Sequence, residues 1–116
     1  MQVLVVLNVD GGAGHRSATA VGLARALIRN EDTSVRLFIV GGNAREVGAR
    51  PPADDSQGLT SLVEGLVSAG VEIRVAGALT DVPVATVGLD SVLGVEPSTV
   101  RGLSEWTLEA DRVLVF

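Results

Sequence analysis

The chain has 116 residues, nine of them basic and fourteen acidic, so its formal net charge is -5 at pH 7. All nine basic residues are arginines, and the absence of lysine excludes Schiff-base catalysis, a Walker-type phosphate loop and a response-regulator mechanism. Without cysteine, the chain cannot carry sulfur or electrons on a thiol of its own. With a single histidine it is also poorly equipped to bind zinc, and we expect no metal and no cofactor.

A chain of this length encloses one hydrophobic core, so we predict a single domain over residues 1–116. Hydrophobic residues make up 47% of the chain, a surplus that predicts burial of some of them in a homo-oligomer interface. No apolar run is long enough to cross a bilayer, and the first residues lack the features of a signal peptide. We therefore expect a cytoplasmic protein. Its negative charge disfavours nucleic-acid and membrane partners.

The first half of the chain predicts two buried strands joined by a helix. Residues 2–7 are a nearly continuous apolar run, typical of a parallel strand covered on both faces. Small and aliphatic residues then predict a buried helix over about 15–29, and residues 34–40 repeat the strand pattern. A short helix is expected at about 43–47, followed by a polar, proline-containing surface loop at 50–56.

The next segment carries the clearest helical periodicity. Five apolar residues fall on one stripe of a helix: Leu59, Leu62, Val63, Leu66 and Val67. Gly70 can supply the left-handed residue that ends such a helix. Residues 71–75 then predict a third strand, with Glu72 and Arg74 pointing outward.

The last third of the chain begins irregularly, over residues 77–88, and residues 89–95 predict a short fourth strand. Pro97 can open a helix, because the first helical position needs no N–H. The inner face of that helix is marked by Val100, Leu103, Trp106 or Thr107, and Ala110. Residues 112–116 predict a fifth strand. Strands alternating with helices in this order predict an α/β fold with a mainly parallel five-stranded sheet.

A glycine-rich turn between the first strand and the first helix is the first candidate site. Backbone N–H groups and the helix dipole attract anions at such a place, and arginine and serine side chains add donors. The residues that could bind a small anionic ligand here are Asp10, Gly11, Gly12, Gly14, His15, Arg16 and Ser17. The alternative is that these glycines only make a tight turn, since the dinucleotide-binding spacing is incomplete.

His15 could also act as a general acid or base, because an imidazole titrates near neutral pH. An enzyme that works without cysteine would pair His15 with Asp10 or Asp81 in one crevice. No serine or cysteine nucleophile motif accompanies the histidine, so we assign no catalytic residue.

The segment after the third strand, together with residues 102–106 and 110–116, resembles the DsrE/DsrF-like family of sulfur-relay proteins. Members of that family commonly carry a persulfide-forming cysteine directly after strand three, often in a Cys-Gly-x-Cys-x-Asp pattern. This chain matches the pattern at Gly77 and Asp81, which the resemblance adds to the candidate ligand-binding residues. Ala76 and Leu79 stand where the two cysteines would be, so sulfur relay is expected to be disabled.

The resemblance implies a three-layer α/β/α sandwich that assembles into dimers, trimers or hexamers. We therefore expect a non-catalytic or degenerate DsrE/DsrF-like protein that self-associates and binds a small anionic ligand or a protein partner at its strand ends. Two alternatives stay open: the cysteine-independent enzyme, and a structural subunit that docks onto a cysteine-bearing sulfur-transfer paralogue.

Overall fold

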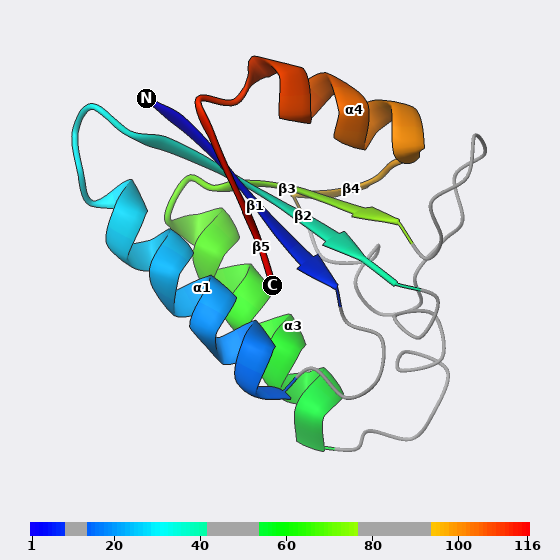
Figure 1. Cartoon of the computed structure of the whole chain (residues 1–116). Coiled ribbons are helices and arrows are strands. Elements are labelled where there is room, and N and C mark those ends of the chain that lie inside the picture. The colour runs from blue at the N-terminus through cyan, green and yellow to red at the C-terminus, as the bar shows by residue number, and fades with distance from the viewer. Residues whose placement is uncertain (9–13, 42–53, 77–93) are drawn as a thin grey trace.

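The computed structural model describes residues 1–8, 14–41, 54–76 and 94–116 (Figure 1). The short helix expected at about 43–47 and the irregular segment 77–88 lie outside these residues. No helix in the described ranges is long and apolar enough to cross a membrane. The elements in chain order are β1 (Gln2–Asn8), α1 (Gly14–Ile28), β2 (Ser34–Val40), α3 (Asp54–Ser68), β3 (Glu72–Ala76), β4 (Val95–Pro97), α4 (Val100–Glu109) and β5 (Arg112–Val115).

The strands form one five-stranded sheet in the order β4-β3-β2-β1-β5, and every neighbouring pair is parallel. β1 and β2 lie inside the sheet, whereas β4 and β5 form its two edges. Each residue from Val3 to Leu7 of β1 is buried, as expected of a strand that is covered on both faces. The predicted parallel sheet is therefore confirmed.

Helices cover both faces of the sheet, α1 and α3 one face and α4 the other (Figure 1). Because successive strand residues point to opposite faces, each strand contributes to two cores. The first core cluster, under α1 and α3, is aliphatic: Val3, Val5, Leu7, Ala20, Val21, Ala24, Val35, Leu37, Ile39, Val63, Leu66, Val71, Ile73, Val75 and Val95. The second core cluster, under α4, comprises Leu4, Val6, Phe38, Val40, Ala76 and Trp106.

The end of α3 follows the prediction closely. Gly70 has a φ of 95°, and its N–H donates to the Val67 carbonyl at 3.1 Å. The Val71 N–H donates to the Leu66 carbonyl at 3.0 Å, which completes a Schellman motif. Val71 and Leu66 both belong to the first core cluster, so the turn that ends α3 also directs the chain into β3.

The predicted surface loop at 50–56 is wrong for its last part, because α3 begins at Asp54. Acidic residues are favoured in the first turn of a helix, where they interact with the positive end of its dipole. The pair Asp54 and Asp55 therefore fits a helix start as well as a polar loop.

The fourth strand was expected at 89–95, but β4 spans Val95–Pro97 and shares only Val95 with that range. Pro97 therefore lies in a strand and does not begin a helix. The Ser98 N–H donates to the Val75 carbonyl at 2.8 Å, so the backbone nitrogen and carbonyl of the preceding Pro97 point away from β3. A proline is tolerated there because no ladder hydrogen bond is needed on the free side of an edge strand.

The last helix begins at Val100, after the N-cap Thr99, whose hydroxyl accepts a hydrogen bond from the Gly102 N–H at 3.4 Å. Its inner face differs from the predicted stripe. Trp106 is buried, and Leu103 and Ala110 pack partly buried against the second core cluster, as expected. Val100 is exposed, however, and Gly102 is buried. Gly102 leaves little room for a side chain: a Cβ on it would overlap the Ser98 hydroxyl and would lie 3.4 Å from an Arg74 guanidinium nitrogen.

Two glycine-to-alanine substitutions should change stability in opposite directions. Gly70→Ala should lower the free energy of unfolding by about 1–2 kcal/mol, because a Cβ is strained at positive φ. Gly22→Ala should raise it by about 0.5–1 kcal/mol, because Gly22 lies inside α1 with open space around it. Urea denaturation followed by circular dichroism measures both. Equal effects of the same sign would contradict the assigned backbone conformation of Gly70.

Candidate functional site

The carboxyl ends of three neighbouring strands lie level with one another. In the parallel register Asn8 of β1 pairs with Val40 of β2, and Val40 pairs with Ala76 of β3. Asn8, the last described residue before the glycine-rich segment, and Ala76, the last before Gly77, therefore lie at the same height in the sheet. One strand separates these two residues, so they are roughly 10 Å apart. Ligands of open α/β sheets commonly bind at this edge.

The first candidate segment continues into the start of α1. The structure places Gly14, His15, Arg16 and Ser17 in the first turn of this helix, which contains no acidic residue. Arg16 is exposed, whereas Ser17 is only 5% exposed. Three further candidates, Asp10, Gly11 and Gly12, lie outside the described residues, as does the side chain of His15.

The second candidate segment is described only at its first residue. Gly77, Leu79 and Asp81 lie outside the described residues, so their predicted roles stay predictions. Ala76 is fully buried, and its methyl group belongs to the second core cluster beneath α4. The Gly41 N–H donates to the Ala76 carbonyl at 3.2 Å and so joins the end of β3 to the residue that follows β2.

The second core cluster is anchored by Trp106, one of the residues predicted for the inner face of the last helix. Its ring meets Phe38 edge to face, with centroids 6.2 Å apart and an interplanar angle of 84°. The Arg36 and Arg74 guanidinium carbons lie 5.0 Å and 4.2 Å from the Trp106 ring centroid. Cation–π contacts of this kind strengthen when the groups are partly desolvated.

Arg74 was expected to point outward, and this prediction is wrong. Its side chain is half-buried between the sheet and α4, and one of its guanidinium nitrogens donates to the Gly102 carbonyl at 3.3 Å. The alternation of β3 places Arg74 on the α4 face, and the long side chain reaches the Trp106 ring while its charged group meets a backbone carbonyl. Glu72 is exposed, as predicted.

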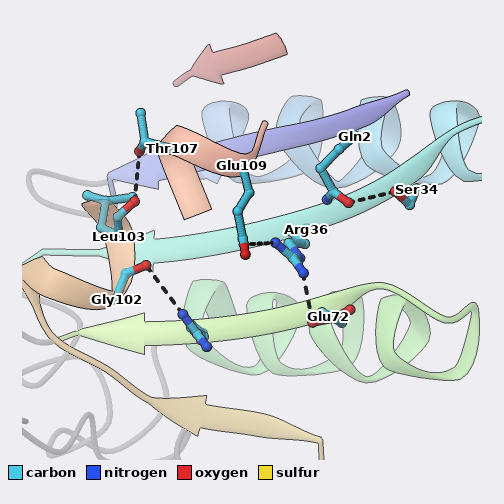
Figure 2. A network of polar contacts seen from close by, with 9 residues as sticks. Gln2, Ser34, Arg36, Glu72, Gly102, Leu103, Thr107 and Glu109 are labelled. Atoms are coloured by element: carbon cyan, nitrogen blue, oxygen red, sulfur yellow. Dashed lines mark hydrogen bonds and ion pairs between the residues drawn. The ribbon is translucent and has the colours of Figure 1, made fainter. Parts of the chain in front are cut away.

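Arg36 joins β2, β3 and α4 at the other end of this cluster (Figure 2). Its Nη1 lies 2.6 Å from a Glu109 carboxylate oxygen, and its Nε lies 3.6 Å from a Glu72 oxygen. Both glutamates are more than half exposed, so these ion pairs contribute little to stability by themselves. The role of Arg36 was not predicted, and its only signal in the sequence is a charged residue within a mostly apolar strand.

Arg36, Arg74 and Trp106 pack α4 against the sheet, and none of them is a nucleophile. Among the described residues, no group of three or more His, Cys, Asp or Glu side chains could hold a metal ion. The features suited to a ligand in the described part of the chain are therefore the exposed Arg16 and the first turn of α1, at the carboxyl edge of the sheet.

The solved structure of the ychN protein from E. coli matches this chain over the whole length of both proteins, with a TM-score of 0.66 and 28% sequence identity. That protein has a DsrE/DsrF-like fold. No family model and no curated protein sequence gives a significant match to the chain. The fold expected from the resemblance is therefore confirmed by a solved structure.

Trp106→Ala should lower the free energy of unfolding by about 3–5 kcal/mol, because it opens a cavity under α4 and removes the ring on which two arginines pack. Leu108→Ala is the matched control on the same helix. Leu108 is 84% exposed, so its truncation should change stability by less than about 0.5 kcal/mol. Urea denaturation followed by far-ultraviolet circular dichroism measures both, and equal losses would contradict the anchoring role of Trp106.

Proposed function

We propose that this chain is a DsrE/DsrF-like protein that carries no sulfur itself, that self-associates, and that binds a small anionic ligand at the carboxyl edge of its sheet. The proposal depends chiefly on the position and burial of Ala76. It ends β3, where the resemblance places a persulfide-forming cysteine, and its side chain is fully buried.

The chemistry at this position leaves no route to sulfur transfer. A methyl group has no lone pair and no titratable proton, so it cannot attack a persulfide or accept its outer sulfur. No other residue can substitute, because the chain contains no cysteine anywhere. What the fold retains is an edge at which the last residues of β1, β2 and β3 lie level, directly before the two candidate segments in the sequence.

The start of α1 is the part of that edge best suited to an anion. The first N–H groups of a helix have no partner within the helix, and they lie at the positive end of its dipole. Arg16 adds a positive charge in the same turn, and no acidic side chain in that turn opposes it. Since the net charge of the chain is -5, the attraction for an anion must be local.

The absence of native cysteine makes the burial of position 76 directly measurable. In Ala76→Cys the thiol should react with Ellman's reagent roughly 100-fold more slowly than in Leu108→Cys, because a buried thiol is reached only through opening transitions. In denaturant the two rates should become equal.

Two results would count against this part of the proposal. Equal rates in the folded state would show that position 76 is open to reagents. A mass increase of one sulfur atom on the wild-type chain, after incubation with a persulfide donor, would show that the protein carries sulfur without a thiol.

Anion binding is tested by thermal unfolding with inorganic phosphate and nucleoside monophosphates as probes. At ten times its Kd, a bound probe should stabilise the fold by about 1.4 kcal/mol and raise Tm by roughly 5 °C. Arg16→Gln should reduce this shift. Arg29→Gln, which removes an exposed arginine beyond the other end of α1, should leave it unchanged.

A Tm that no probe raises would overturn the anionic ligand. A shift that Arg16→Gln and Arg29→Gln reduce equally would show an effect of net charge and no site at the start of α1. Both variants remove one positive charge, so the comparison isolates the position of that charge.

A further inference from the structure

The two edges of the sheet differ in how they are protected. The exposed part of β4 consists of Glu96, which is charged, and Pro97, which has no N–H to offer. Charges and prolines are the features that keep sheet edges from pairing with other chains. β5 has neither within its run Val113, Leu114 and Val115, and its one charged residue stands at its start.

The backbone of β5 is ready to accept another strand. The Phe116 N–H donates to the Val6 carbonyl at 2.8 Å, and the Phe116 carbonyl accepts the Asn8 N–H at 3.0 Å, so Phe116 directs both groups toward β1. Because successive residues of a strand alternate, Val113 and Val115 direct their N–H and carbonyl groups toward the outer side of β5. In the described part of the chain no strand lies on that side.

The side chains of Val113 and Val115 lie on the same face of the sheet as the second core cluster, but α4 does not cover them. Val113 pairs in register with Leu4, and Val115 pairs with Val6. Leu4 and Val6 are 0% and 8% exposed, whereas Val113 and Val115 are 40% and 72% exposed. The apolar surface of this face therefore continues to the edge of the sheet and remains in contact with solvent.

We propose that a second copy of this chain covers this edge by pairing its β5 antiparallel to the first, about a two-fold axis at Leu114. This inference rests on the self-association in the proposed function and names its surface. The same strand then meets itself, as a two-fold interface requires. The two sheets become one continuous sheet across the dimer.

The register follows from which backbone groups are free. With the axis at Leu114, Val113 of each copy lies opposite Val115 of the other, and each pair exchanges both of its hydrogen bonds. An axis at Val113 would require the Asp111 N–H, which already donates to the Gln2 carbonyl at 2.8 Å. An axis at Val115 would leave the backbone groups of Val113 without a partner inside β5.

The same register is self-complementary in its side chains. Both valines of each copy lie on the α4 face, so the facing pairs place apolar side chains next to each other across the junction. The two most exposed apolar positions of β5 are then covered together, and Glu96 and Pro97 remain at the outer ends of the joined sheet.

The first test is the mass of the assembly, measured by native mass spectrometry and by size-exclusion chromatography with light scattering. The wild-type chain should form a dimer or an assembly built from dimers. Val115→Lys should weaken the dimer by roughly 100-fold or more, because it places a charge from each copy in an apolar junction. Glu96→Lys puts the same side chain on the opposite edge and should leave the assembly intact.

The second test reads the register directly. Antiparallel residues opposite each other in a pair without hydrogen bonds have Cα atoms about 4.5 Å apart, which is within the range of a disulfide. Leu114→Cys lies on the proposed axis and should form a disulfide-linked dimer under mild oxidation. Glu96→Cys, also exposed on an edge strand, should stay unlinked on a non-reducing gel.

The outcomes distinguish the proposed β5 interface from self-association through some other surface. A wild-type chain that stays monomeric at high concentration overturns both. An oligomeric wild-type chain that Val115→Lys does not dissociate and Leu114→Cys does not link overturns the β5 interface alone. Neither result bears on anion binding at the start of α1, which has its own measurement.

Discussion

β1 and β2 pair in parallel along their whole length, and the helices are placed by the need to cover both faces of this pair (Figure 1). Both strands lie inside the sheet and are apolar on both faces, so water must be excluded from each side. α1 and α3 meet this need on one face with aliphatic side chains. α4 excludes water from the other face with Trp106, whose ring packs against Phe38. In the described part of the chain no second helix covers this face.

The packing of α4 on the second face also determines which chemical groups are available at the carboxyl edge of the sheet. The end of β3 is held against the second core cluster, and Ala76 completes that packing. At the same edge, the start of α1 offers backbone N–H groups and Arg16. Our proposal follows from this contrast: one strand end has only hydrocarbon where relatives are expected to hold a thiol, while the neighbouring helix start retains groups that attract an anion.

In the described part of the chain α4 alone covers the second face of the sheet, and its cover does not reach β5. Leu4 and Val6 are covered, but the valines beside them in register are not. Apolar side chains and free backbone groups therefore occur on the same two residues. β5 differs in this from β4, where a charged residue and a proline protect the edge. The surplus of apolar residues can therefore be assigned to one proposed interface, the outer edge of β5.

Local features could be predicted from the sequence: the apolar runs of the inner strands, the stripe of α3 and the left-handed glycine at its end. The absence of any thiol follows from composition. These properties depend on neighbouring residues and on composition, so periodicity and turn chemistry reveal them. The order of the strands, the start of α4, the partial burial of Arg74 and the exposure of Val115 became apparent only in the folded chain. Each of these depends on which distant segment packs alongside, because a strand pattern specifies two faces but not the partner that covers them. For the candidate site, the sequence could identify the two segments and the missing cysteine, whereas only the register showed that Asn8 and Ala76, which precede these segments, lie at one level.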